Sequence, residues 1–201
     1  MWSKVRYCPA CAAPLESAPV FGRERLRCPA CAFVLFANPV GAAGAVVVDP
    51  DRRILLVRRA IAPHAGSWAL PAGYQEIDES PSGAAEREVR EETGVTIRTV
   101  ALLDLVFVPD DPRKPANVAL FLAIPVAGEP SGRDDALDAD WFALDDLPRR
   151  LAFESNHRIL ERLAKASDES RGWWASWRAA LDDSNETDAS NAGTEGNDRV
   201  D

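Results

Sequence analysis

A dense acidic stretch, GYQEIDESPSGAAEREVREETGV, spans residues 73–95 and places four glutamates within seven positions. Like charges three or four positions apart on a helix repel by roughly 0.2–0.5 kcal/mol per pair. A helix is nevertheless expected here, because Ser80 can cap its start, Pro81 suits the first helical position and Gly94 can end it. Some favourable interaction must therefore offset the repulsion.

The spacing of the glutamates suggests what that interaction is. At about 100° per residue, Glu88, Glu91 and Glu92 lie within an arc of about 100° on one helical face. With Glu79 in the preceding loop they form a dense group of hard oxygen donors, which suits Mg²⁺. Cation binding would offset the repulsion. The alternative is a solvated acidic face paired with arginines of the same helix, such as Arg87.

Composition favours one main domain with a small appendage. The chain has 201 residues, of which 46% are hydrophobic and 27% charged, enough apolar side chains for a core. The longest apolar runs are too short to cross a bilayer, so no membrane association is expected. The opening MWSKVRYCPAC lacks an apolar signal core, and a cytoplasmic location is predicted.

The net charge of −9 is concentrated at the C-terminal end. Residues 182–201 hold seven acids and one base, hence 7 − 1 = 6 of the nine negative charges, and almost no large apolar side chain. Such a segment cannot bury enough surface to fold, so we expect a disordered acidic tail over 182–201. Residues 167–181 are expected to form a C-terminal helical extension before it. An acidic balance makes nucleic acid an unlikely partner.

All four cysteines fall in two CPAC motifs separated by 16 residues: Cys8, Cys11, Cys28 and Cys31. Two such pairs can place four thiolates around one structural Zn²⁺, which predicts a zinc ribbon over residues 1–37. A redox pair or disulfides are the weaker alternatives, since neither a βαβ pattern nor a secretion signal accompanies the motifs. Ala12 and Ala32 follow the motifs where glycine is usual, so each turn must accommodate an alanine.

The remaining pattern indicates an α/β sandwich over residues 38–166. Two β runs flank an Asp-Pro-Asp turn at 49–51, and residues 66–74 are expected as a loop because of their Gly and Pro content. Further β runs are expected at 96–108, 118–126 and around 141–144, followed by a helix over about 154–166. Strands mixed with a central and a terminal helix are typical of this class.

The whole 23-residue stretch resembles a complete Nudix box. Gly73 is followed after five residues by Glu79 and after seven more by REVREETGV. The segments GSWALPAG and DADWFALDDLP resemble the regions flanking the box in that family, so the resemblance covers about residues 38–165. It implies an α/β/α sandwich with a mixed sheet that hydrolyses nucleoside diphosphates linked to another moiety, using Mg²⁺ or Mn²⁺.

The resemblance also implies roles for individual residues. Arg87 and Glu79 would form a salt bridge that orients the loop and the helix. One of the box glutamates, or an acid outside the box, would accept a proton from water, and Asp138 stands where a downstream glutamate often lies. The implied metal ligands are the carboxylates of Glu88, Glu91 and Glu92 and the carbonyl of Ala72.

Within the family, the chain is similar to the ribbon-bearing FAD and ADP-ribose pyrophosphatases. The NADH pyrophosphatases are the alternative, but their SQPWPFPxS stretch after the box has no counterpart here. A nucleotide-sensing binding protein on the same fold is a further alternative, although no box carboxylate is missing. The expected partner is a nucleotide-derived small molecule, and a homodimer is left open.

Substrate contacts outside the box are less defined by the sequence. Trp68, Tyr74 and Phe107 are candidate walls of a substrate pocket, with packing in the core as the alternative for each. The two histidines, His64 and His157, are expected to be surface or structural residues.

Overall fold

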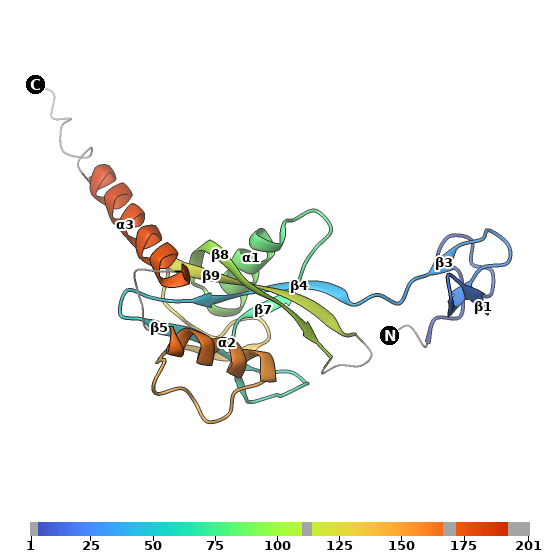
Figure 1. Cartoon of the computed structure of the whole chain (residues 1–201), viewed down its shortest axis with the longest axis horizontal. Coiled ribbons are helices and arrows are strands. Elements are labelled where there is room, and N and C mark those ends of the chain that lie inside the picture. The colour runs from blue at the N-terminus through green and yellow to red at the C-terminus, as the bar shows by residue number, and fades with distance from the viewer. Residues whose placement is uncertain (1–3, 110–113, 167–171, 193–201) are drawn as a thin grey trace, which may run out of the picture.

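The computed structural model describes residues 4–109, 114–166 and 172–192. Its N-terminal part is a small antiparallel sheet of order β1-β2-β3, which Figure 1 shows at one end of the molecule. The strands are β1 (Glu16–Val20), β2 (Arg23–Arg27) and β3 (Val34–Leu35). One CPAC motif precedes β1 and the other precedes β3, so the pairing of β2 with both neighbours draws the motifs together.

Two sheets form the main body. A four-stranded sheet has the order β7-β4-β9-β8, in which β4 and β9 are parallel and the other pairs antiparallel. A three-stranded sheet has the order β10-β5-β6 and is antiparallel. The strands are β4 (Val40–Val47), β5 (Arg53–Arg59), β6 (Trp68–Ala69), β7 (Ala72–Tyr74), β8 (Thr96–Val108), β9 (Ala116–Ala127) and β10 (Ala136–Ala143).

Helices cover both faces of these sheets. Val46 of β4 packs in a cluster with Leu160 of α2 (Glu154–Lys165) and Trp174 of α3 (Gly172–Ala192). The next residue, Val47, belongs to a cluster with Val89 of α1 (Pro81–Thr93). Successive side chains of a strand point to opposite faces, so both faces of β4 are buried. The predicted α/β/α sandwich with a mixed sheet is confirmed.

Local signals set the bounds of α1 as expected. Ser80 is the N-cap, and its hydroxyl accepts a hydrogen bond of 3.1 Å from the N–H of Gly83. Pro81 starts the helix, and Gly94 ends it at φ 75°, in the left-handed region that glycine adopts without a Cβ penalty. The acidic helix is therefore held at both ends by its own sequence.

The expected loop over residues 66–74 is wrong in part, because it contains strands β6 and β7. β7 pairs with β4, placing Ala72 opposite Gly44 and Gly73 opposite Ala43. A Cβ added to Gly44 would lie 2.4 Å from the Cβ of Ala72, so the close pairing requires glycine there. This pairing carries Ala72 and Gly73 to the edge of the sheet beside α1.

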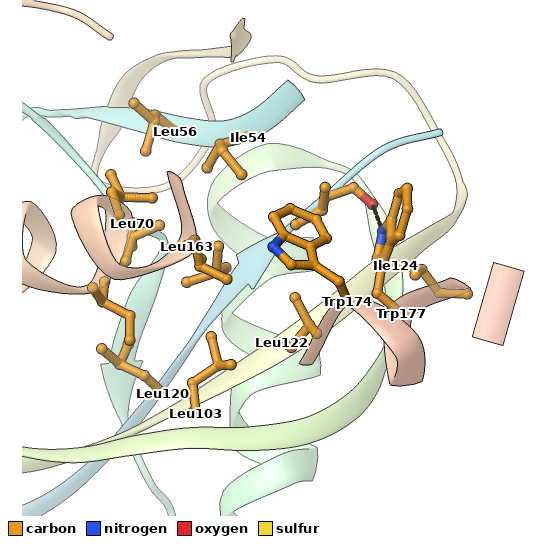
Figure 2. Packing of buried hydrophobic residues seen from close by; sticks show 14 of the residues in the cluster. Ile54, Leu56, Leu70, Leu103, Leu120, Leu122, Ile124, Leu163, Trp174 and Trp177 are labelled. Atoms are coloured by element: carbon orange, nitrogen blue, oxygen red, sulfur yellow. Dashed lines mark hydrogen bonds between the residues drawn. The ribbon is translucent and has the colours of Figure 1, made fainter. Parts of the chain in front are cut away.

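The C-terminal helix is part of the core. Trp174 and Trp177 are each 1% exposed, and their rings meet edge to face at 5.4 Å. Figure 2 shows both tryptophans against Leu122 and Ile124 of β9, with the indole N–H of Trp177 donating to the carbonyl of Val48 at 3.1 Å. The sequence predicted that residues 167–181 extend the chain as a helix, and α3 begins at Gly172.

One boundary must be corrected. Helix α3 continues to Ala192, whereas a disordered tail was predicted from residue 182. Once a packed segment has nucleated a helix, each added residue gains a hydrogen bond at little further cost, and acidic composition alone does not stop it. The rest of the predicted tail, residues 193–201, lies outside the described residues.

Candidate active site

Arg87, on α1, joins this helix to the preceding loop of residues 74–79. Its guanidinium makes two hydrogen bonds to Glu79, from Nη2 to Oε1 at 2.6 Å and from Nε to Oε2 at 3.0 Å. The expected ion pair between these residues is therefore present. Nη2 also donates to the carbonyl of Tyr74 at 3.0 Å, and Nη1 donates to Glu88 at 2.7 Å and Glu91 at 2.9 Å.

This geometry fixes the charge of Glu79. The hydrogen bonds from Arg87 lower the pKa of Glu79 to about 2, assisted by the N–H of Glu76, which donates to Glu79 at 2.8 Å. The amide of Gln75 donates to the Glu79 carbonyl at 2.7 Å. Residues 74–79 are thus bonded to one another, and Arg87 ties them to α1 through the Glu79 carboxylate and the Tyr74 carbonyl.

Glu92 is the most deeply placed acid of the box. Only 5% of it is exposed, and its Oε2 accepts a hydrogen bond of 3.1 Å from the N–H of Ala72. Burial raises the pKa of Glu92 well above its usual range, and the charges of Asp135 and Glu88 add to this effect. A buried carboxylate near two others is unfavourable without a cation, so its environment suits one.

Glu88 lies against the backbone of Gly73. A Cβ added to Gly73 would lie 2.2 Å from the carboxyl carbon of Glu88, so only glycine leaves room for this side chain. Burial raises the pKa of Glu88, opposed by the neighbouring Arg87. Gly73 is therefore required for a close approach between β7 and α1.

A cavity of about 410 Å³ opens beside these acids. Glu88, Glu92, Ala72 and Gly73 line it, whereas Glu91 and Glu79 are not among its lining residues. Glu91 instead has a side chain 45% exposed and paired with Arg87. The structure thus brings two of the three predicted glutamate ligands to one cavity, and the third is not among its lining residues.

Oxygen donors of this kind fit Mg²⁺ or Mn²⁺. The evidence is the donor chemistry and the burial of Glu92 beside like charges, both of which a hard cation would relieve. The glutamates do not form a tight ligand group by themselves. In residues 4–109, 114–166 and 172–192, the four cysteines alone bring three or more metal-binding side chains within 4.8 Å of one another.

The sequence pattern did not identify Asp135 and Arg59 as candidate site residues. Both line the cavity, and both act electrostatically on Glu92, the first raising and the second lowering its pKa. Arg59 is further held by its Nε, which donates to the Pro63 carbonyl at 2.9 Å. The pairing of β10 with β5 brings the two residues together, since the N–H of Ala60 donates to the Asp135 carbonyl at 2.8 Å. No local pattern marks this contact.

Asp138, singled out for its position in the sequence, is not in the cavity. It is exposed, and its Oδ1 accepts a hydrogen bond of 3.0 Å from the N–H of Ala139. The acid that reaches the site from this segment is Asp135, three positions earlier. A bulge between residues 136 and 138 of β10 changes the side of the sheet to which the side chains there point.

Of the three aromatic residues considered as candidate pocket walls, Tyr74 alone lines the cavity. The ammonium of Lys114 lies 3.4 Å from the centre of its ring. Trp68 packs edge to face against Phe142 at 4.7 Å, and Phe107 is exposed outside the cavity. Both histidines are exposed, and His64 meets the ring of Phe153 at 4.9 Å.

The four cysteine Sγ atoms lie within 4.8 Å of one another, a spacing compatible with a tetrahedral thiolate site. The Sγ atoms of Cys8 and Cys31 are 3.6 Å apart, and Cys11 lies 3.5 Å from both Cys28 and Cys31. Zn–S bonds of about 2.3 Å imply sulfur separations of about 3.8 Å in a tetrahedron. Ala12 and Ala32 each adopt φ 60°, so both turns do place an alanine in the left-handed region.

The fold agrees with the comparisons to known proteins. The NUDIX domain family matches residues 38–163, and the chain belongs to this family. It is a Nudix hydrolase. The chain is 36% identical over 121 residues to an ADP-ribose pyrophosphatase of Methanocaldococcus jannaschii, covering 60% of this chain and 70% of that protein.

Two further relatives extend the likeness beyond the central domain. The NAD-capped RNA hydrolase NudC of Stutzerimonas stutzeri is 31% identical over 163 residues, which is 80% of this chain and 56% of that protein. A NUDIX hydrolase from Nitrosomonas europaea has a similar structure, with a TM-score of 0.73 and 26% identity over 81% of this chain and 92% of that one. None of the described helices is long and apolar enough to span a membrane.

Proposed function

We propose that the protein hydrolyses the pyrophosphate bond of an ADP-linked compound, with ADP-ribose or FAD as the preferred substrate. The observation that carries this proposal is the convergence of Glu88, Glu92, Asp135 and Arg59 on one cavity beside the Ala72–Gly73 backbone. The likeness to an ADP-ribose pyrophosphatase favours ADP-ribose. The absence of the SQPWPFPxS stretch argues against NADH.

The residues divide into three roles. Glu88 and Glu92 would hold Mg²⁺ or Mn²⁺, together with Glu91 and the Ala72 carbonyl. When bound, such an ion neutralises phosphate oxygens and lowers the pKa of water. Arg59 provides a fixed positive charge for a substrate phosphate, since its position is held by Pro63. Arg87 and Glu79 are positioning residues that keep the loop of residues 74–79 against α1.

Water is the nucleophile in this proposal. A carboxylate would accept its proton, and the candidates for that step are Glu88 and Asp135, because both line the cavity. The four cysteines would hold one structural Zn²⁺ with no open coordination position, so the ribbon takes no part in the chemistry. A nucleotide sensor without catalysis is set aside, because every carboxylate of the box is present.

An NAD-type substrate is the second candidate. Its support is the likeness to the NAD-capped RNA hydrolase, which extends over 80% of this chain. The two candidates share the adenine nucleotide half and differ in the group on the other side of the pyrophosphate. Discrimination therefore depends on contacts with that second group.

The test is a comparison of kcat/KM for ADP-ribose, FAD, NADH and 8-oxo-dGDP, with Mg²⁺ and with Mn²⁺. Hydrolysis in ¹⁸O-water identifies the attacked phosphorus from the labelled product. We expect ADP-ribose or FAD to lead by about tenfold or more. If kcat/KM is highest for NADH by that factor, the NAD-type candidate is the correct one. If it is highest for 8-oxo-dGDP by that factor, both candidates are refuted.

A further inference from the structure

The ribbon differs in charge from the rest of the chain. Residues 4–37 hold five bases and two acids, a net charge of 5 − 2 = +3, so the remainder of the protein carries −9 − 3 = −12. Figure 1 shows the ribbon and helix α3, which contains the start of the acidic C-terminal segment, at opposite ends of the molecule. Exposed charges more than about 8 Å apart are largely screened at physiological ionic strength. The acidity of the whole chain therefore does not exclude an anionic ligand at the ribbon.

A cavity of about 380 Å³ opens on the ribbon. The charged and polar residues that line it are Arg6, Arg23, Glu24, Arg25 and Asn38. Side chains alternate along β2, so Arg23 and Arg25 share one face of the strand. Their partners on β1 are apolar, since Arg23 lies opposite Val20 and Arg25 opposite Ala18. Glu24, which the alternation directs to the other face, accepts a hydrogen bond of 2.7 Å from the Ser17 hydroxyl. Positive charge therefore predominates in this cavity.

Two phenylalanine rings lie beside these arginines. The rings of Phe21 and Phe36 are nearly parallel, with their centres 6.4 Å apart and their planes at 17°. The guanidinium carbon of Arg25 lies 5.1 Å from the centre of the Phe36 ring, and its Nη1 donates to the Val20 carbonyl, which fixes its position. Phe21 is 83% exposed and Phe36 is 44% exposed. Two aromatic rings and a cation are thus aligned at the surface.

Phe21 occupies a position that is unfavourable for an exposed aromatic residue. It is the first of the two residues that connect β1 to β2, with φ 49°, and Gly22 follows at φ 72°. A hairpin turn with positive φ at both central positions usually carries Asn-Gly. A phenylalanine here has a strained backbone and buries little surface in return. Strain of this kind is typical of binding sites, and here it points to a ligand that covers the ring.

We propose that the ribbon binds a single-stranded nucleic acid, with Phe21 and Phe36 stacking on its bases and Arg23 and Arg25 contacting its phosphates. A positively charged groove beside aromatic rings holds single strands without reading their sequence, because every base has a π face. The base faces of a duplex are already covered by neighbouring bases, so the rings cannot reach them. An acidic peptide would pair with the arginines and leave both rings uncovered. This inference does not depend on the hydrolytic function proposed above.

Fluorescence anisotropy of labelled oligonucleotides tests this inference with the full-length protein and without added Mg²⁺. The ligands are short oligouridylate, oligothymidylate and a duplex of the same length. We expect the single strands to bind with Kd of about 1–100 μM, and the duplex at least about fivefold more weakly. Each phosphate contact adds about −0.7 to the slope of log K against log salt for a single strand, so two arginines predict a slope of about −1.4. Affinity should then fall about sevenfold between about 50 and about 200 mM salt.

Substitutions separate stacking from charge. Phe21→Asn removes the ring and suits the turn, so it should lower affinity by about fivefold or more, leave the salt slope unchanged and raise or preserve Tm. Phe21→Trp should restore affinity. Arg23→Gln should make the salt slope shallower by about 0.7. The matched controls are two exposed residues of the main body, and neither Phe107→Ala nor Arg149→Gln should change binding.

Three results would overturn the inference: no binding of either single strand at about 100 μM and low salt, equal binding of the duplex, or full affinity in Phe21→Asn. Displacement of the strand by oligoglutamate at equal charge concentration would also overturn it, and would assign the surface to an acidic protein segment. Binding of either strand supports it, and the ratio of the two affinities shows whether ribose or deoxyribose is preferred. Hydrolysis of ADP-ribose should be unchanged in Phe21→Asn, so the proposed function stands or falls separately.

Discussion

The N–H of Ala72 donates a hydrogen bond of 3.1 Å to Oε2 of Glu92, which joins strand β7 to the last turn of α1. This bond holds a buried carboxylate at the edge of the cavity, where its burial raises its pKa. It also orients one carboxylate oxygen toward the backbone and leaves the other for a different partner. The position of Glu92 is thus set by the strand pairing that carries Ala72.

Replacing Glu92 with Gln removes the charge and keeps the shape. The fold should persist or gain slightly in Tm, because a carboxylate buried beside Asp135 and Glu88 is unfavourable without a cation. Turnover of ADP-ribose should fall by about 100-fold or more, since carboxylate support for the metal is lost. Steady-state kinetics over a Mg²⁺ titration measures both kcat and the metal requirement.

Glu161→Gln is the matched control for this experiment. That glutamate lies on the surface of α2 and pairs with Lys165 at 3.0 Å, so its loss should leave the rate unchanged. Near-normal rates for both Glu88→Gln and Glu92→Gln would show that the metal site has been misassigned.

The ion pair between Arg87 and Glu79 should make stability depend on pH. The pKa of Glu79 is lowered in the folded protein to about 2, from an ordinary 4.5. A lowered pKa means that the contribution is fully present above pH 4.5 and is lost as the pH falls towards 2. Glu79→Gln should therefore lower Tm at pH 7 and have a smaller effect at pH 3. An equal loss of Tm at both pH values would mean that charge is not the cause.

The cysteine cluster should bind about one zinc per chain. Cys8→Ser should release the metal and unfold the ribbon, while the main body, which has its own core, keeps its fold. Metal analysis and circular dichroism before and after chelation measure both effects. Disulfides in place of zinc would contradict the assignment.

The two alanines at φ 60° offer a sharper test of the ribbon. The left-handed conformation costs an alanine about 1 kcal/mol or more, a penalty that glycine does not have. Ala12→Gly and Ala32→Gly should each stabilise the zinc-bound ribbon by up to about 1 kcal/mol, seen as slower zinc loss to a chelator. Ala30→Gly, at an exposed residue without a positive φ, is the control and should not slow release.

Helix α3 should contribute to stability through its first turns. Trp177→Phe removes the hydrogen bond to the Val48 carbonyl and should cost about 1–2 kcal/mol, while truncation before Gly172 removes both buried tryptophans and should cost several times more. Truncation after Ser184 keeps the packed turns and the bond of 2.7 Å from Arg98 to the Ser184 hydroxyl. A large loss of Tm from that last truncation would show that later residues also dock.

Features that depend on neighbouring residues could be read from the sequence. The cap at Ser80, the stop at Gly94 and the pairing of the two CPAC motifs follow from short-range geometry, and the structure has all three. The shared face of Glu88 and Glu92 likewise follows from helical periodicity. The Nudix resemblance extended this local information to the fold class.

Other features needed tertiary structure, because they join segments with no common periodicity. Asp135 reaches the cavity through the pairing of β10 with β5, and Asn156 reaches it from α2. Composition predicted disorder from residue 182. It contains no information on the burial of Trp174 and Trp177, which anchors the start of a helix that continues past that residue. Burial of a side chain depends on what the rest of the chain packs against it, and no local pattern contains that information.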